Sequence, residues 1–452
     1  MNHGPFGRTI SARGAGLGVR REVNHSVGPP VLLGRDRGAG TGACPDTEMS
    51  AEAEGALTLL KGSTVKPGHH AKILTAMIGL GLAAAAYSST STSSSARSAT
   101  PATTPASSPP PAAFLGGLHG LTQVASTVPA NGDVNPYGVA VVPASGGRLT
   151  AGDVLVSNFN DKANVQGTGT TIVQVSPAGK TSVFASIAAL PAGQTCPGGI
   201  GLTTALGILP GGWVVVGSLP TSRGGVLPGL NPAGCLIVLN DQGTVAETIT
   251  NPDIAGPWDL TVKSSATSAA VFVSNALGGN TTTHAGVPVT GNCTVVRLDL
   301  ALSAGSPPKL TGTTVIGTQF PWRANQAALI LAPTGLALSG NGTLYVDDTQ
   351  TNSVSAIPQA LTRTSAITAV AGTLSTGGAL DAPLGMTIAP NGDLIVVNGN
   401  NGNAVEITPA GKQIATRTLI KNGAGDLFGI ITTQRGLIIN NDGTNALDQA
   451  NM

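Results

Sequence analysis

Few side chains in this sequence could perform acid–base chemistry. Beyond residue 86, the histidines are His119 and His284, and the glutamates are Glu247 and Glu406. No serine lies in the G-x-S-x-G pattern that presents a nucleophile on a sharp strand-to-helix turn. Histidine is the side chain that most often carries general acid–base catalysis. We therefore predict no catalytic residue and turn to the aspartates.

Two aspartates stand at the start of apolar segments that we expect to be inner strands of a β-sheet, Asp259 next to Trp258 and Asp426. A carboxyl group at such a position could transfer a proton, or it could only cap a turn. Capping is the simpler interpretation, and we keep both aspartates as candidate binding residues.

Aromatic residues near the same strand starts suggest a binding face. Tyr137 and Trp258 each precede an apolar run, and the segment "QFPWRANQ" carries Phe320, Trp322 and Arg323. Aromatic rings beside one cation suit a small polar ligand, a carbohydrate or a protein segment. We expect these residues to line the mouth of a channel.

Three cysteines lie beyond residue 86. Cys235 and Cys293 occupy equivalent positions at the start of a third strand, which favours a bridge between them, and Cys196 with Cys235 is the alternative pairing. No close pair of cysteines with histidines gives a zinc motif, so we predict no metal ligands.

A repeated pattern must position these residues. From about residue 114 an apolar segment with a leading turn recurs, marked by the following residues: Gly138, Gly199, Asp259, Gly335, Gly385 and Gly429. The intervals are 61, 60, 76, 50 and 44 residues, and each segment is followed by further apolar strands. Six strand-rich repeats of this size predict an all-β, six-bladed β-propeller with four antiparallel strands in each blade.

The fourth and fifth repeats resemble NHL-repeat proteins. They read "APTGLALSGNGTLYVDDTQTNSVSAI" and "APLGMTIAPNGDLIVVNGNNGNAVEI", with a P-x-G start, an N-G turn and an Asn before the third strand. The resemblance implies a propeller of the kind found in exported bacterial NHL-repeat proteins. Some related six-bladed propellers are lactonases or esterases with a divalent cation in the channel, but the acidic ligand set of those enzymes has no match here.

Asn and Asp recur five residues apart between the second and third strands. The pairs are Asn275 with Asn280, Asp347 with Asn352, Asn398 with Asn403, and Asn440 with Asn445. Asn and Asp close turns through local hydrogen bonds and tolerate left-handed backbone. We interpret the pairs as turn residues, because calcium loops usually carry more carboxylates.

The sixth repeat reaches only a third strand before Met452. Residues 115–127 ("LGGLHGLTQVAST") could supply the missing outer strand and close the ring, which would remove exposed strand edges. A seven-bladed ring is the alternative, since the long third repeat could contain another blade. Long loops between the second and third strands of blades one to three would form a wall beside the channel mouth.

The chain before the propeller reads as processing sequence. Residues 1–65 look like an unstructured extension or lie upstream of the true start of translation, and 66–86 resemble a signal peptide with a short apolar run. Residues 87–112 form a Ser/Thr/Pro/Ala linker, and the propeller occupies 113–452. The signal predicts a secreted, periplasmic or cell-envelope protein without a membrane span after cleavage.

Composition narrows the partners. Charged residues are 10% of the chain, aromatic residues 3%, and the net charge is +1. Without a cluster of Lys or Arg, nucleic acid is excluded as a partner. We predict an exported, non-catalytic binding or scaffold propeller that recognises a polar ligand or protein at the channel mouth and has no cofactor. The alternative is a metal-dependent lactonase- or esterase-like hydrolase with a divalent cation in the channel.

Overall fold

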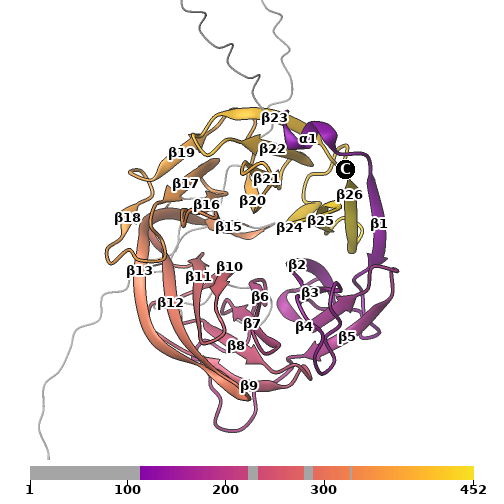
Figure 1. Ribbon diagram of the computed structural model, residues 1–452, viewed down its shortest axis with the longest axis vertical. Coiled ribbons are helices and arrows are strands. Elements are labelled where there is room, and N and C mark those ends of the chain that lie inside the picture. The colour runs from indigo at the N-terminus through magenta and orange to yellow at the C-terminus, as the bar shows by residue number, and fades with distance from the viewer. Residues whose placement is uncertain (1–111, 222–232, 279–288, 326–327) are drawn as a thin grey trace, which may run out of the picture. The chain divides into compact units, whose positions relative to one another are not determined.

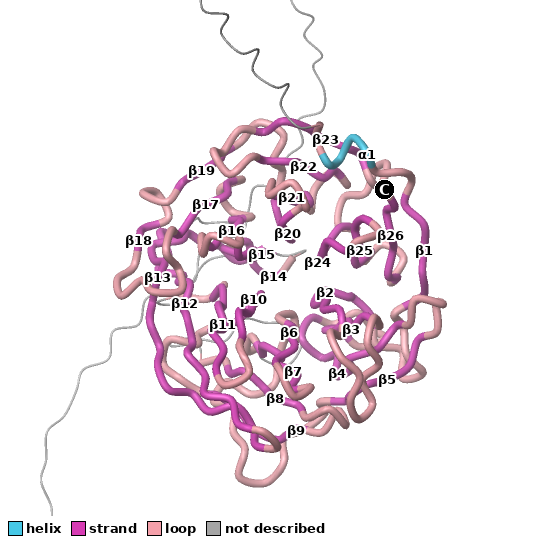
Figure 2. Tube along the Cα trace, in the orientation of Figure 1, coloured by secondary structure: helices cyan, strands magenta, loops and turns pink. Residues whose placement is uncertain are grey.

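The computed structural model describes residues 112–452 apart from 222–232, 279–288 and 326–327 (Figure 1). The expected extension (1–65), the expected signal peptide (66–86) and all of the linker except Ala112 lie outside the described residues. Within the described part, α1 (Phe114–Gly117) is the only helix, and strands make up nearly all of the regular structure (Figure 2). Within the described residues, no helix has the length and hydrophobicity needed to span a membrane.

The strands form six antiparallel blades around a central axis, numbered here in the order of their inner strands (Figure 1). The inner strands are β2 (Val134–Val141), β6 (Leu206–Leu209), β10 (Pro257–Ser264), β15 (Pro333–Leu338), β20 (Pro383–Ile388) and β24 (Leu427–Thr433). The second strands are β3 (Val154–Asn160), β7 (Trp213–Ser218), β11 (Ser268–Asn275), β16 (Leu344–Asp348), β21 (Leu394–Asn398) and β25 (Gly436–Asn441).

The third strands are β4 (Gln166–Val175), β8 (Cys235–Leu239), β12 (Val289–Ser303), β17 (Ser353–Ile357), β22 (Asn403–Ile407) and β26 (Ala446–Asn451). The outer strands are β5 (Thr181–Ser186), β9 (Val245–Ile249), β13 (Ser306–Asn325), β19 (Thr373–Thr376), β23 (Gln413–Thr418) and β1 (Leu121–Ser126). Two short strands, β14 (Leu329–Leu331) and β18 (Ile367–Thr368), both pair with β13. The predicted six-bladed, all-β fold is confirmed.

The second strands explain why the repeats read as continuous apolar runs. Every residue of β16 and of β21 is buried. A blade packs against a neighbour on each face, so its middle strands face apolar cores on both sides. The side chains of blades two and three, for example, share one core that joins Val215, Val271 and Val296.

The two ends of the chain complete the same blade. β1 pairs with β26 as the outer strand of blade six, with Leu121 opposite Ala450, and the backbone N–H of Thr127 donates to the carbonyl of Asn445. α1 adds a second anchor, because the N–H groups of Phe114 and Leu115 each donate to the buried Glu406 carboxylate at 2.8 Å. The predicted closure by N- and C-terminal strands is confirmed.

The extra length of the third repeat forms long strands, not a seventh blade. β12 has 15 residues and β13 has 20, and β13 extends far enough to pair in parallel with β18 of the next repeat. The seven-bladed alternative is therefore wrong.

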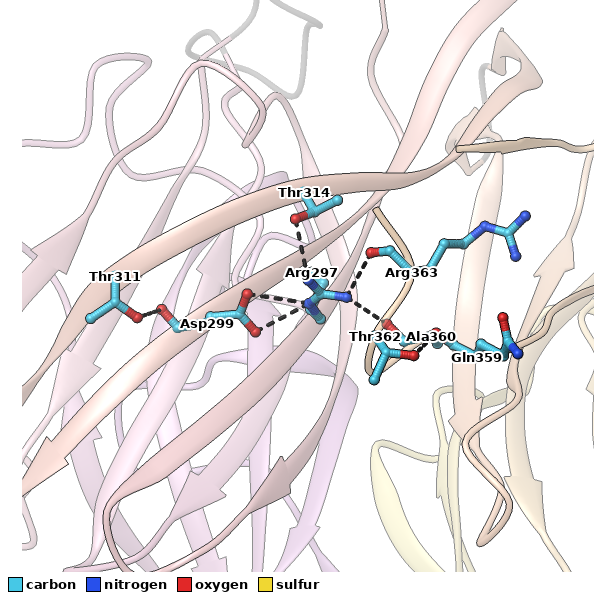
Figure 3. Close-up of polar contacts among 8 residues, drawn as sticks. All are labelled: Arg297, Asp299, Thr311, Thr314, Gln359, Ala360, Thr362 and Arg363. Carbon is cyan, nitrogen blue, oxygen red and sulfur yellow. Dashed lines mark hydrogen bonds and ion pairs between the residues drawn. The ribbon is translucent and has the colours of Figure 1, made fainter. Parts of the chain in front are cut away.

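Arg297 fastens blade three to the segment that follows β17 (Figure 3). Its guanidinium donates to the backbone carbonyls of Ala360 and Arg363, both at 2.9 Å, and its Nε lies 3.1 Å from the carboxylate of Asp299. The buried charge thus has an ionic partner and several acceptors, which is the condition under which a protein interior tolerates it.

Two local expectations were wrong. We placed the inner strand of blade two around Gly199, but residues 197–204 form a connection in which Leu202 makes a single bridge to Leu219, and β6 begins at Leu206. Residues 319–325 of the segment "QFPWRANQ" are not a mouth loop, because they form the end of β13. The first error arose because β6 has only four residues, too few for its alternation of apolar and polar residues to be recognised. The second arose because aromatic residues occur both in binding loops and in buried strands, so composition alone does not separate the two.

The favoured disulfide was also wrong. Cys196 pairs with Cys235, with their Cα atoms 5.3 Å apart, and Cys293 is a buried free cysteine. Cys196 and Cys235 belong to the core shared by blades one and two, whereas Cys293 lies in a different core with Phe320 and Trp322. Equivalent strand positions in neighbouring blades therefore point into separate cores and do not meet.

The recurring amides close turns and also link blades. Asn352 and Asn445 have positive φ values of 52° and 49°, as a left-handed turn requires. Their side-chain oxygens accept hydrogen bonds from Ala382 N–H at 2.6 Å and Asn135 N–H at 2.7 Å, at the entry to the following blade. Asn280 lies outside the described residues.

Closure predicts a clear difference between two deletions. Removing residues 115–127 should lower the melting temperature of the propeller strongly, because blade six loses its outer strand and Glu406 loses the backbone donor of Leu115. Removing residues 88–111 should leave the melting temperature almost unchanged. Thermal unfolding followed by circular dichroism checks this, and equal melting temperatures for the two deletions would contradict it.

Candidate functional site

Four aromatic side chains meet near the axis, and we call them the aromatic plug: Tyr137, Phe159, Trp258 and Phe428. The ring centroids of Tyr137 lie 5.6 Å from Trp258 and 5.8 Å from Phe428, and Phe159 stacks on Phe428 at 6.3 Å. The Tyr137 hydroxyl donates to the carbonyl of Leu384 at 2.7 Å. Edge-to-face and offset contacts of this kind are favourable beyond simple burial.

Most of the plug comes from one position of the repeat. Tyr137, Trp258, Leu384 and Phe428 each stand immediately before the recurring Gly or Asp of their inner strand. The sequence analysis did not single out Phe428. Aligning "DLFG" with "PYG" and "PWD" would have found it, because Phe428 then occupies the position of Tyr137 and Trp258. Because these residues occupy equivalent positions in different blades, their side chains lie at the same level along the central axis.

A cavity of about 550 Å³ lies on one side of the plug, and we call it the mouth cavity. All four plug residues line it. Its polar lining includes residues from the start of β2, from the links between second and third strands and from the end of β13: Asn135, Asn164, Gln166, Arg323, Asn325, Gln350, Asn352, Asn400 and Asp442. Its volume is typical of a small-molecule site.

Four polar atoms of residues in this lining have no hydrogen-bond partner among the described residues: Asn135 Oδ1, Trp258 Nε1, Arg323 Nε and Gln350 Oε1. Asn135 has a positive φ of 66°, a left-handed conformation that Asn adopts more readily than most residues. Buried polar groups are normally paired. These residues thus contribute two unpaired acceptors and two unpaired donors to the mouth cavity.

A second cavity of about 430 Å³ lies on the other side of the plug, and we call it the axial cavity. Tyr137 lines both cavities, whereas Asp259 lines the axial one. Most of its remaining lining is aliphatic and runs along the inner strands, from Leu206 and Leu336 to Leu338 and Ile388.

The candidate residues named from the sequence fall into four places. Tyr137, Trp258 and Arg323 line the mouth cavity, and Asp259 lines the axial cavity. Phe320 and Trp322 are fully buried in the core, where the Trp322 indole N–H donates to the Gly278 carbonyl at 3.0 Å. They therefore cannot contact a ligand at the mouth, which corrects our expectation. β13 directs both side chains into the core that also contains Cys293.

Asp426 lies outside both cavities, and its neighbour Asp442 lines the mouth. The backbone N–H of Asp442 donates to the carbonyl of Asp426. Burial, and then repulsion from Asp426, raise the pKa of Asp442 to about 7. We did not single out Asp442 from the sequence, where it appears only as part of a turn.

Of the three long loops expected as a wall, the structure describes mainly that of blade one, which contributes Asn164 and Gln166 to the mouth cavity. The corresponding loops of blades two and three fall largely at 222–232 and 279–288, outside the described residues. His119 is exposed on the outer strand side, and His284 is outside the described residues.

Buried aspartates without a cationic partner collect near the axis between blades three and four. Burial raises the pKa of Asp347 to about 8 and that of Asp348 to about 7, and the charges of Asp259 and Asp348 raise that of Asp347 further. Asp347 Oδ1 accepts from the Thr334 hydroxyl at 2.5 Å and the Gly335 N–H at 2.6 Å. Its Oδ2 has no partner among the described residues. These carboxyl groups favour the protonated form.

The described residues do not fit a metal ion held by an acidic cluster. No group of three His, Cys, Asp or Glu side chains comes together within them. Both Asp259 carboxylate oxygens already accept backbone N–H groups, from Leu260 at 2.8 Å and from Leu336 at 2.9 Å. We therefore derive no chemistry through a channel cation.

The chain matches no protein-family model and no curated protein sequence. Among solved structures it is similar to a gluconolactonase from Xanthomonas campestris, at 15% identity over 75% of this chain and 90% of that chain, with a TM-score of 0.45. A calcium-binding regucalcin from Agrobacterium tumefaciens is 12% identical over 72% and 92% of the two chains, with a TM-score of 0.42.

A catalytically inactive virginiamycin B lyase from Staphylococcus aureus with quinupristin is 14% identical over 73% and 87% of the two chains, with a TM-score of 0.40. Similarity at this level concerns the fold, and a fold does not determine an activity. The similarity to NHL-repeat proteins stays a resemblance of the two quoted repeats.

The buried aspartates predict that stability falls as pH rises. An Asp that titrates near 3.8 in the unfolded chain and near 8 in the fold, as Asp347 does, binds more protons when folded. The free energy of unfolding is then highest below about pH 4 for this group and declines up to about pH 8, by an amount on the order of a few kcal/mol.

Asp347→Asn should reduce the difference in the free energy of unfolding between pH 5 and pH 9. The amide oxygen still accepts a hydrogen bond from Thr334, but the side chain cannot ionise. Urea unfolding at both pH values measures it. Glu247→Gln, at a partly exposed strand position, is the matched control and should leave the slope unchanged. An unchanged slope in Asp347→Asn would show that this carboxyl does not titrate in the expected range.

Proposed function

We propose that the mouth cavity binds a small, hydroxyl-rich ring compound such as a carbohydrate or a cyclic ester. The observation that carries the proposal is an aromatic floor beneath polar side chains in a single cavity of about 550 Å³. Aromatic faces stack on the apolar face of a sugar ring, and amide side chains both donate to and accept from its hydroxyls.

The unpartnered atoms of the mouth support the same ligand class. Asn135 Oδ1 and Gln350 Oε1 can each accept a hydroxyl proton, and Arg323 Nε can donate to a ligand oxygen. Leaving a buried polar group unpaired is unfavourable by about 1–3 kcal/mol. A ligand that pairs these atoms recovers part of that free energy, which favours a compound with several hydroxyls over an apolar one.

Hydrolysis of a cyclic ester is the second candidate, and the position of Asp442 favours it. Its pKa of about 7 places a carboxylate near the optimum for a general base at neutral pH. Asp442 would take a proton from water as the water oxygen attacks the ester carbonyl, and Arg323 would stabilise the oxyanion. The ring C–O bond then breaks, and the departing alkoxide takes up the proton that Asp442 received, which gives a hydroxy acid and restores the Asp442 carboxylate.

Glucose and its δ-lactone are suitable probes for both candidates. We expect saturable binding of both by calorimetry, with Gln350→Leu weakening each about tenfold, since the Gln350 side chain makes no hydrogen bond within the described structure. Asp442→Asn should keep glucose binding and reduce lactone turnover about 100-fold or more, within the usual contribution of a general base. Glu247→Gln is the control for both measurements.

The two candidates fail separately. Binding of the lactone without turnover above the buffer rate would remove hydrolysis and leave the binding proposal intact. Equal affinity of wild-type protein and Gln350→Leu for both probes would show that the mouth cavity is not the site.

We further propose that the protein is exported. The short apolar run at residues 73–86 and the Cys196–Cys235 disulfide support this, because disulfides persist mainly in oxidising compartments. Sequencing the N-terminus of protein from the extracellular or periplasmic fraction should give a start near Tyr87. Recovery of the protein only from the cytosol, with residues 1–86 intact, would contradict export.

A further inference from the structure

We propose that the axial cavity is a second ligand site, separate from the mouth, which takes a small apolar primary amine and pairs its ammonium group with Asp259. The cavity lies on the other side of the aromatic plug, and it shares only Tyr137 with the mouth cavity. The proposal therefore does not rest on the function proposed for the mouth.

The walls of the axial cavity suit an apolar ligand. Aliphatic side chains from all six inner strands line it and are partly exposed: Val139, Ile208, Val262, Leu338, Ile388 and Ile431. Removing such surface from water contributes roughly 25 cal/mol per Å². A ligand with an aliphatic body is thus stabilised along the length of the channel.

One position of the repeat places a single carboxylate in these walls. The recurring inner-strand residue is glycine in four other blades, where a Cβ would lie only 1.9 Å from the Tyr137 carbonyl at Gly429 and 2.3 Å from the Phe428 carbonyl at Gly385. Blade three has Asp259 at this position instead. Its side chain reaches across to blade four, where Oδ2 accepts the Leu336 N–H at 2.9 Å.

Asp259 is positioned to accept one more donor. Each carboxylate oxygen accepts one backbone N–H, and each can accept a second hydrogen bond. The residue is partly exposed and lines the cavity. The lining contains no Lys, Arg or His, so none of the lining side chains neutralises the carboxylate.

The surroundings of Asp259 favour a cation over a neutral donor. The Tyr137 hydroxyl already donates to the Leu384 carbonyl, so its proton is not directed at Asp259. Burial raises the pKa of Asp259 to about 7, because the charged carboxylate loses hydration in this cavity and is therefore unfavourable. An ammonium group within hydrogen-bond distance offsets that cost, because charge-assisted hydrogen bonds are the stronger ones.

The test uses n-hexylamine as the probe and n-hexanol and hexanoate as its matched analogues, with the purified chain at pH 8. Calorimetry should show saturable one-to-one binding of hexylamine, at least tenfold weaker binding of hexanol and no binding of hexanoate. Asp259→Asn should weaken hexylamine at least tenfold and leave hexanol unchanged. Ile208→Trp, which fills the cavity, should abolish both.

Two further variants act as controls. Asp347→Asn removes a buried carboxyl that lines neither cavity, and Gln350→Leu alters only the mouth, so both should bind hexylamine within about threefold of wild type. Thermal unfolding verifies that each variant is folded. Should Asp259→Asn not fold, Ile208→Trp and the comparison of amine with alcohol decide the question.

The proposal is overturned by any of three results: no saturable binding of hexylamine, equal affinity of wild-type protein for hexylamine and hexanol, or unchanged hexylamine affinity in folded Ile208→Trp.

Discussion

The pairing of β1 with β26 is the constraint on which the rest of this propeller depends. Each blade buries its middle strands against two neighbours, so an open ring would expose the apolar faces of its two terminal blades. Closure joins residues more than 300 positions apart, and the contact of α1 with Glu406 anchors the same segment to blade five. Because the ring is closed, the inner strands are held around a common axis.

Crowding at that axis explains both the glycines and the plug. At Gly385 and Gly429 the neighbouring inner strand approaches too closely for any side chain. The preceding residue faces the axis, and there Tyr137, Trp258 and Phe428 fill the channel. The recurring glycine thus allows neighbouring inner strands to lie close together. The side chain before it fills the channel and separates the mouth cavity from the axial cavity.

Because the sequence contains few charged residues, several carboxyl groups near the axis have no cationic partner. Asp259, Asp347 and Asp348 have raised pKa values because burial disfavours their charged forms. Arg297 is a buried cation that lies further out, where it donates to the Ala360 and Arg363 carbonyls and joins blades three and four (Figure 3). The lining of the axial cavity accordingly contains a carboxyl group and no Lys, Arg or His, whereas the mouth cavity contains amides, Asp442 and Arg323.

The sequence by itself predicted most of the strands, six blades as the favoured number, and the closure by the two ends of the chain. These follow from local periodicity and from the strand that the last repeat lacks, and both properties are readable along the chain. Tyr137, Trp258 and Asp259 could be singled out for the same reason, since they stand at fixed positions of the repeat.

Only the tertiary structure decided which side chains meet. It paired Cys196 with Cys235, buried Phe320 and Trp322, and placed Asp259 and Arg323 in different cavities. Repetition fixes the place of a residue within its blade. Its neighbours are set by which face of the blade it points from and by how closely the next blade packs, and neither is encoded in the period of the sequence.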